Sequence, residues 1–268
     1  MPKILIVCAL FFEAKPFINQ LKLKALYTQS SLRVFGNNEY ILVVSGTGKV
    51  AAAIAVTQVL SQEQFSIQSI WNIGICGSKA HTVGDILLID SIIDNDTQRT
   101  SYLDVFLSSE LPVSSLRTLS QSDSQQSFEE AVDMEASGFC EAASFFLPLH
   151  KIHALKIVSD LANVSVLEKE KLEIMLKDKT KDCLDFINKE GVSLEEKKTQ
   201  FIIEKFDELF EEQRLSFTEQ KEFEKLFYSL QIQTGKSKEE ILKLLSLPKN
   251  EENKKRGDMV LKRLKELF

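Results

Sequence analysis

Residues 40–60 read YILVVSGTGKVAAAIAVTQVL, which is an apolar run, a glycine turn and an alanine-rich segment in direct succession. All five residues of Tyr40–Val44 are apolar, as is typical of a strand buried on both faces. Ser45–Gly48 supplies the turn, and Lys49–Leu60 has its larger apolar residues at helical intervals. A strand, turn and helix in this order indicate an α/β layer architecture.

The same alternation extends over the first 188 residues. Four further apolar runs predict strands and two further segments predict helices: strands at Lys3–Ala9, Ser69–Ile75, Ile86–Ile93 and Ile152–Val158, and helices at Met134–Phe146 and Val166–Asn188. This pattern predicts an α/β domain with a mixed, mostly parallel sheet flanked by helices. Residues 97–130 are rich in serine and weakly periodic, so we expect a loop or a partly disordered crossing there.

The composition changes near Gly191. From there to Phe268, apolar residues recur at helical spacing among glutamates and lysines. Ser237 is placed to cap a helix through Glu240, and Pro248 would end that helix. We therefore predict two domains, an α/β domain over residues 1–188 and an all-α C-terminal extension over residues 189–268.

Net charge, hydropathy and the spacing of cysteines and histidines argue against several classes of protein. The net charge of −6 argues against a nucleic-acid-binding surface over the whole protein, and no apolar stretch approaches the ~20 residues that span a bilayer. The first apolar run lacks a cleavage site and leads into charged residues, so we expect no signal peptide. The cysteines have no CxxC spacing, which fits reduced thiols in a cytoplasmic protein: Cys8, Cys76, Cys140 and Cys183. The three histidines have no ligand spacing, so we expect neither a metal site nor a cofactor.

Carboxylates and glycine turns follow several predicted strands. Glu13, Gly46–Gly48, Gly74–Gly77 and Asp160 all lie just beyond an apolar run. Ligands of open α/β sheets gather beyond the carboxyl ends of the strands, so these residues can converge on one site. Lys49 follows a glycine turn but lacks the GxxxxGK spacing of a Walker A motif.

Six segments in order resemble the 5′-methylthioadenosine/S-adenosylhomocysteine nucleosidases and their purine nucleoside phosphorylase relatives. They are Ile6–Glu13, Ser45–Ala52, Asn72–Gly77, Val83–Ile86, Val132–Ala136 and Ile157–Asp160. Each segment alone is weak, but six in the family's order are specific, and together they cover roughly the first 188 residues. The resemblance implies a nucleoside phosphorylase-like fold, a homodimer, and hydrolysis of the N-glycosidic bond of a purine nucleoside or related N-riboside.

The resemblance also implies roles for individual residues. Glu13 matches the acid/base that orients the attacking water, and Asp160 matches the aspartate that donates a proton to purine N7. Glu135 matches the ribose-binding glutamate. The remaining residues that we place in the substrate-binding set are Ser45, Gly46, Asn72, Gly74, Met134, Lys156 and Ser159.

Departures from the family leave alternatives open. Asn72 stands where phosphorylases hold phosphate with an arginine, which favours water over phosphate as acceptor. Ile75 replaces a serine or threonine, Lys156 replaces an arginine, and the segment before Met134 is short, with Phe128 as its candidate aromatic ring. The alternatives are a phosphorylase, a futalosine-type hydrolase, and a degenerate nucleoside-binding or regulatory module. The helical extension is either a cap on the α/β domain or a contact for a protein partner, with nucleic acid less expected.

Overall fold

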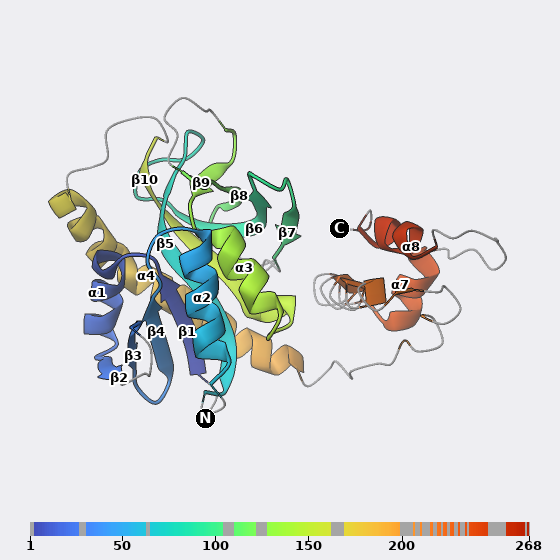
Figure 1. The fold of residues 1–268 in the computed structure, drawn as a ribbon, viewed down its shortest axis with the longest axis horizontal. Helices are drawn as coiled ribbons and strands as arrows, with labels where there is room; N and C mark the ends of the chain where they lie inside the picture. The colour runs from blue at the N-terminus through green and yellow to red at the C-terminus, as the bar shows by residue number, and fades with distance from the viewer. Residues whose placement is uncertain are drawn as a thin grey trace. The chain divides into compact units, whose positions relative to one another are not determined.

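The chain divides into two compact units, Met1–Gly191 and Val192–Phe268, which are described separately (Figure 1). The computed structural model describes residues 3–26, 31–62, 65–103, 110–121, 128–161 and 169–198, and beyond these, positions within 206–267 that include 236–245 and 256–265. The residues that the sequence predicts for the site all lie in the first unit. The predicted division into domains at residue 188 stays a prediction.

A ten-stranded sheet forms the centre of the first unit. Its strands are β1 (Lys3–Cys8), β2 (Lys24–Leu26), β3 (Arg33–Gly36), β4 (Tyr40–Val44), β5 (Ile67–Gly77), β6 (Ile86–Asp94), β7 (Thr100–Tyr102), β8 (Val113–Thr118), β9 (Ala131–Asp133) and β10 (Ile152–Asp160). The order is β10-β6-β8-β9-β5-β1-β4-β3-β2, with β7 on β6 and an additional β10–β5 pairing. Because β10 pairs with both β5 and β6, the strands β5, β10, β6, β8 and β9 close a circuit at one end of the sheet.

The prediction of a mostly parallel sheet is wrong, because the sheet is mixed. Its centre, β4–β1–β5–β10, is parallel as expected. Antiparallel pairs are added where β2 and β3 join β4 as a meander, where β7 and β10 flank β6, and where β9 meets β5. These additional strands are short or partly exposed, so they lack the continuous apolar runs that identify the central strands.

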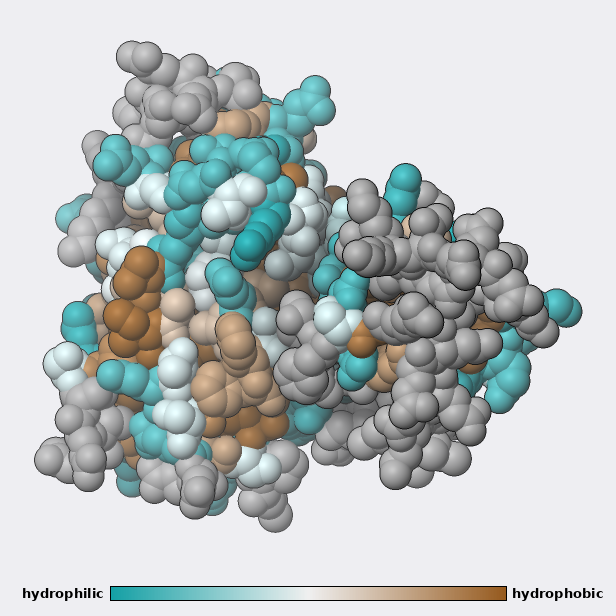
Figure 2. Space-filling model, turned by 45° about the vertical axis from the view of Figure 1, so that its right-hand side comes forward, coloured by the Kyte–Doolittle hydropathy of each residue, from teal (hydrophilic) through white to brown (hydrophobic). Residues whose placement is uncertain are grey.

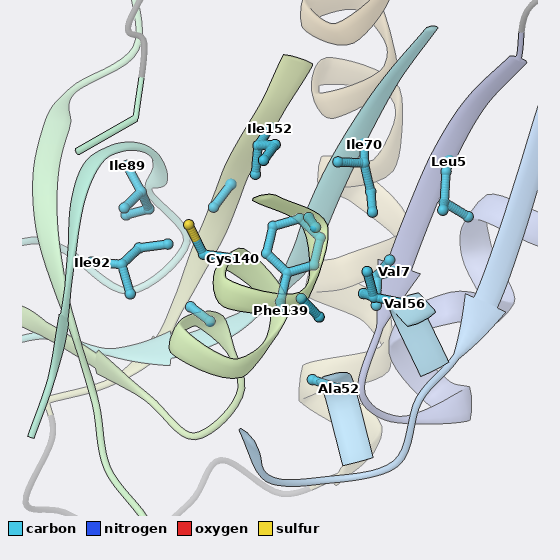
Figure 3. Close-up of a cluster of buried hydrophobic side chains, with 14 of the residues drawn as sticks. Leu5, Val7, Ala52, Val56, Ile70, Ile89, Ile92, Phe139, Cys140 and Ile152 are labelled. Carbon is cyan, nitrogen blue, oxygen red and sulfur yellow. The ribbon is translucent and has the colours of Figure 1, made fainter. Parts of the chain in front are cut away.

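Within the described part of this unit, four α-helices cover the sheet: α1 (Phe11–Gln20), α2 (Lys49–Leu60), α3 (Ala136–Ser144) and α4 (Lys169–Lys198). The helix α2 has the predicted bounds, α3 is shorter than predicted, and α4 continues past Asn188. Figure 3 shows Phe139 and Cys140 of α3 facing apolar side chains of the strands, among them Ile70 and Ile152. Because all four of these side chains are 0 or 1% exposed, α3 is fixed by the core, and its N-terminus is fixed with it.

The expectation of a loop at residues 97–130 is wrong in part. The strands β7 and β8 lie within it, and β8 pairs in parallel with both β6 and β9. Only Leu116 of β8 is a buried apolar side chain, and Val113, its other large apolar residue, is exposed. Periodicity is therefore too weak to reveal this strand. Residues 104–109 and 122–127 of the expected loop lie outside the described residues.

The second unit has an apolar core rich in phenylalanine, in which Phe206, Phe210, Phe223 and Phe227 contact one another. Its described helices include α7 (Lys238–Leu245) and α8 (Arg256–Lys265). The predicted cap of α7 is confirmed: the Ser237 N–H donates to Glu240 Oε2 (2.8 Å), and the Glu240 N–H donates to Ser237 Oγ (3.3 Å). Pro248 lies outside the described residues. No helix among the described residues is long and apolar enough to cross a membrane.

Candidate active site

The first site residue, Glu13, is a buried carboxylate held by backbone groups. On α1, its Oε2 accepts the Leu10 N–H (2.8 Å), and its Oε1 accepts the Ile75 N–H (3.1 Å) from β5. Gly74 makes room for this contact, because a Cβ there would lie 3.1 Å from Oε1. Burial raises the pKa of Glu13, although both N–H groups and Lys156 oppose the rise. A carboxylate with a raised pKa is suited to accept a proton near neutral pH.

Lys156 and Asp133 form a buried ion pair beside this carboxylate. The Lys156 ammonium lies 2.9 Å from Asp133 Oδ2, and both side chains are 1% exposed. Asp133 also accepts hydrogen bonds from Thr118 Oγ1 (2.8 Å) and from the N–H of Ala136 (2.9 Å) at the start of α3. Burial alone would lower the pKa of Lys156, but the attraction of Asp133 and then Glu135 outweighs it and raises the pKa. The ammonium is therefore bound within the protein, whereas the sequence suggested a contact with substrate.

Glu135 lies between β9 and α3 and contacts the glycine turn. Its Oε1 accepts the Gly48 N–H (2.8 Å), its side chain is buried, and burial raises its pKa. Gly48 has φ +96°, a left-handed conformation that favours glycine. Met134 is half-buried beside Glu135. The turn after β4 and the start of α3 therefore meet at this carboxylate.

Ser159 and Asp160 close the site at the end of β10. The Ser159 hydroxyl lies 2.7 Å from Asp160 Oδ2 and 3.1 Å from the carbonyl oxygen of Cys76, and can donate to either. Asp160 pairs in register with Gly77, and its carbonyl accepts the Ser78 N–H (2.9 Å). Asp160 is half-buried, so the strand end fixes its backbone while the carboxylate remains partly accessible.

Three other candidates use their polar atoms or backbone within the protein. The Ser45 hydroxyl donates to the Gly46 carbonyl (2.8 Å), and Asn72 Nδ2 donates to the Val7 carbonyl (3.3 Å). Asn72 is buried in the sheet two residues before Gly74, and its Oδ1 accepts no hydrogen bond from the described residues. Gly46 has φ +85° and is half-buried, so the turn that it forms leaves its backbone accessible.

Sequence reasoning missed Asp133. One signal for it was available, because Lys156 lies inside an apolar strand, and a buried ammonium requires a partner. Among the described residues, no group of three or more histidine, cysteine, aspartate or glutamate side chains is arranged to hold a metal ion.

Gly138 sets the distance between α3 and the glycine turn, since a Cβ there would lie 2.0 Å from the Lys49 carbonyl oxygen. Alanine normally stabilises a helix by about 1 kcal/mol relative to glycine. Here the contact is with backbone that cannot rotate away, so we expect Gly138→Ala to destabilise the protein by about 1–3 kcal/mol. Urea unfolding measures this change, with Ser144→Ala at the end of α3 as control. Equal or greater stability of Gly138→Ala would show that the close approach is not constraining.

The chain is similar in sequence to a known family over part of its length. Residues 3–122 match the family model described as Phosphorylase superfamily. No curated protein matches the chain in sequence.

Solved structures with the same fold include three nucleosidases. The 5′-methylthioadenosine nucleosidase of Arabidopsis thaliana has a TM-score of 0.58 at 17% identity, over 70% of this chain and 96% of that one. The 5′-methylthioadenosine/S-adenosylhomocysteine nucleosidase of Helicobacter pylori has a TM-score of 0.55 at 18% identity, over 70% and 99%. That of Campylobacter jejuni has 0.56 at 18%, over 70% and 100%. The resemblance predicted from sequence is thus confirmed: residues 3–122 match the phosphorylase superfamily, and the chain contains the whole nucleosidase fold.

Proposed function

We propose that the protein hydrolyses the N-glycosidic bond of a purine nucleoside or related N-riboside and releases the base. The observation that carries this proposal is the set of carboxylates at one end of the sheet: Glu13 and Glu135 around the buried Lys156–Asp133 pair, and Asp160 at the end of β10, the strand that carries Lys156. Such a reaction needs a base for water, an anchor for the ribose hydroxyls and an acid for the leaving base.

The proposed roles follow from the environment of each group. Glu13, ionised, takes a proton from the water whose oxygen bonds to C1′ of the ribose. Glu135 accepts hydrogen bonds from ribose hydroxyls, for which its Oε2 is available beside the Gly48 contact on Oε1. Asp160 gives its proton to purine N7 as the C1′–N9 bond breaks, and Ser159 orients its carboxyl group. The products are ribose, or its 5′-substituted form, and the free base.

Water is the proposed acceptor of the ribosyl group, because the Lys156 ammonium is not available to bind phosphate. Its ammonium is 1% exposed and bound to Asp133, and Asn72 is buried in the sheet. The test is chromatographic assay of base release from 5′-methylthioadenosine, S-adenosylhomocysteine, adenosine, inosine and futalosine, with and without phosphate. Release that needs no phosphate supports the hydrolase. Release only with phosphate, accompanied by a ribose 1-phosphate, would establish a phosphorylase.

A nucleoside-binding module without turnover is the second candidate. It is favoured by Ile75, where the family has a hydroxyl, although the Ile75 backbone N–H still binds Glu13. Saturable nucleoside binding with no base release from any compound of the panel would select it.

The pH dependence follows from Glu13. Its ionised form is the active one, and burial raises its pKa, so the acidic limb of the pH profile of kcat/KM should have a midpoint above the ordinary glutamate value of about 4.3. Lys156 lowers the pKa of Glu13, so Lys156→Gln should move that midpoint to still higher pH. Initial rates over pH 3–9 measure both, and a midpoint that Lys156→Gln leaves in place would argue against Glu13 as the base.

The α2–α3 face is the proposed surface of a homodimer. Val50 and Ile54 on α2 are 73% and 50% exposed, and Phe145 after α3 is 83% exposed. Figure 2 shows apolar side chains gathered over this face. Light scattering should give a dimer that Ile54→Glu dissociates, with Ile174→Glu on α4, 62% exposed, as control. A monomeric native protein would refute the assignment.

Residues 189–268 are proposed to form a separate helical module, either a cap or a contact for a protein partner. The same light-scattering experiment on a chain ending at Gly191 distinguishes these roles. A cap's removal should cause aggregation or unfolding, whereas removal of a partner-binding module should leave a folded protein. The four cysteines are buried thiols, which suits the reducing cytoplasm, where we place the protein.

A further inference from the structure

Arg117 on β8 belongs to a cluster that the proposed mechanism does not use. Its guanidinium lies over the ring of Phe128, with Cζ 5.0 Å from the ring centroid, and its Nη2 lies 2.5 Å from Glu130 Oε1. The Arg117 and Glu130 side chains are 15% and 20% exposed. The ion pair with Arg117 is the main cause of a lowered pKa at Glu130, so the carboxylate stays ionised and the guanidinium stays fixed.

The register of the sheet places Arg117 on the same face as Asp160. Asp160 pairs with Gly77, Gly77 pairs with Val132, and Val132 pairs with Arg117. Paired residues of neighbouring strands point to the same face, so the side-chain positions of Gly77, Val132 and Arg117 form one row. Asp160 follows a shift in the β10–β5 register and pairs with Gly77 at the end of this row. Three strand spacings of ~4.8 Å separate the ends of this row by at most about 14 Å. Gly77 has no side chain, and Val132 has a small one. The surface of the sheet between Asp160 and Arg117 is therefore apolar, and no large side chain projects from it.

We propose that Arg117 recognises the substituent at position 6 of the purine and that the physiological base is a 6-oxopurine. This inference rests on the proposed function, in which Asp160 protonates N7. Position 6 lies on the same edge of a purine as N7, and the row extends from Asp160 towards Arg117. The purine ring would lie over Gly77 and Val132.

The chemistry of the guanidinium selects between bases. Arginine has five N–H donors and no acceptor. A carbonyl at position 6 accepts a hydrogen bond from it, whereas an amino group there would place donor against donor. Glu130 occupies one donor of Nη2, and Nε is buried without a hydrogen-bond partner among the described residues. Stacking on Phe128 and the ion pair with Glu130 hold the planar group in one orientation, which directional recognition requires.

The test compares free hypoxanthine and adenine, because their binding needs no turnover. Titrations followed by NMR should show hypoxanthine bound about 10- to 100-fold more tightly than adenine by the full-length protein. Arg117→Met should remove that preference, and Arg117→Lys should restore only part of it. Arg99→Met, which removes an exposed arginine, is the matched control and should keep the wild-type ratio.

Each outcome separates this inference from the proposed function. Equal or tighter binding of adenine by the wild-type protein, binding of neither base, or an unchanged ratio in a folded Arg117→Met variant would overturn it. If Arg117→Met does not fold, the comparison of hypoxanthine and adenine binding by the wild-type protein tests the inference. Hypoxanthine preference without base release from inosine would overturn the proposed hydrolysis while leaving the recognition by Arg117 intact. Rapid release of base from adenosine and from no other nucleoside would support the proposed hydrolysis and overturn the recognition by Arg117.

Discussion

Asp160→Asn is expected to lower kcat for base release by about 10²- to 10⁴-fold, the contribution typical of a positioned general acid. An asparagine amide can still accept the Ser159 hydroxyl, so the strand end and the protein's stability should change little. KM should also change little, because the variant loses a proton and keeps the shape of the side chain. The measurement is steady-state base release on whichever nucleoside the wild-type protein turns over.

Asp185→Asn is the matched control, since Asp185 is an exposed aspartate on α4. It should retain wild-type kcat. If Asp160→Asn also retained kcat within a few-fold, the base would be leaving without protonation by this side chain, and the proposed assignment of Asp160 would be wrong.

Lys156→Met is expected to destabilise the protein by about 3–5 kcal/mol, because it leaves Asp133 buried without its counter-ion. Lys24→Met, at an exposed lysine of the edge strand β2, should change the free energy of unfolding by less than about 0.5 kcal/mol. Denaturant unfolding of the two variants measures the difference.

A second substitution isolates the charge effect. Asp133→Asn removes the other charge while keeping an oxygen that can accept the Ala136 N–H at the start of α3. The double variant Lys156→Met/Asp133→Asn should therefore be more stable than Lys156→Met alone. If the double variant lost the sum of the two single effects, packing of the lysine stem, and not the ion pair, would be responsible.

The parts of the fold predictable from sequence are those with continuous burial. β4 and α2 have the predicted bounds, since β4 is buried along its whole length and α2 packs four apolar residues into the core. The helix α1 was not predicted, although Leu10 begins it and Glu13 caps it, because Pro16 interrupts its pattern. The antiparallel additions to the sheet could not be predicted, since strand direction depends on pairing between residues far apart in sequence.

In the candidate site, too, some residues could be predicted from sequence and others could not. Glu13, Glu135 and Asp160 are visible in sequence because each belongs to a short motif at a strand end. Asp133 acquires its role from Lys156 on β10, and Arg117 from its pairing with Val132 on β9, which in turn pairs with Gly77 on β5. Local spacing does not encode those contacts, so the buried ion pair and the row across the sheet emerge only from the register.

Base release in phosphate-free buffer, compared between the wild-type protein and Glu13→Gln, tests whether the protein is a hydrolase that uses Glu13 as its base. We predict that the wild-type protein releases base from at least one purine nucleoside. We also predict that Glu13→Gln, folded to the same extent by circular dichroism, releases it at least about 10²-fold more slowly. Absence of release by a folded wild-type protein, or equal rates for the two proteins, would contradict this assignment.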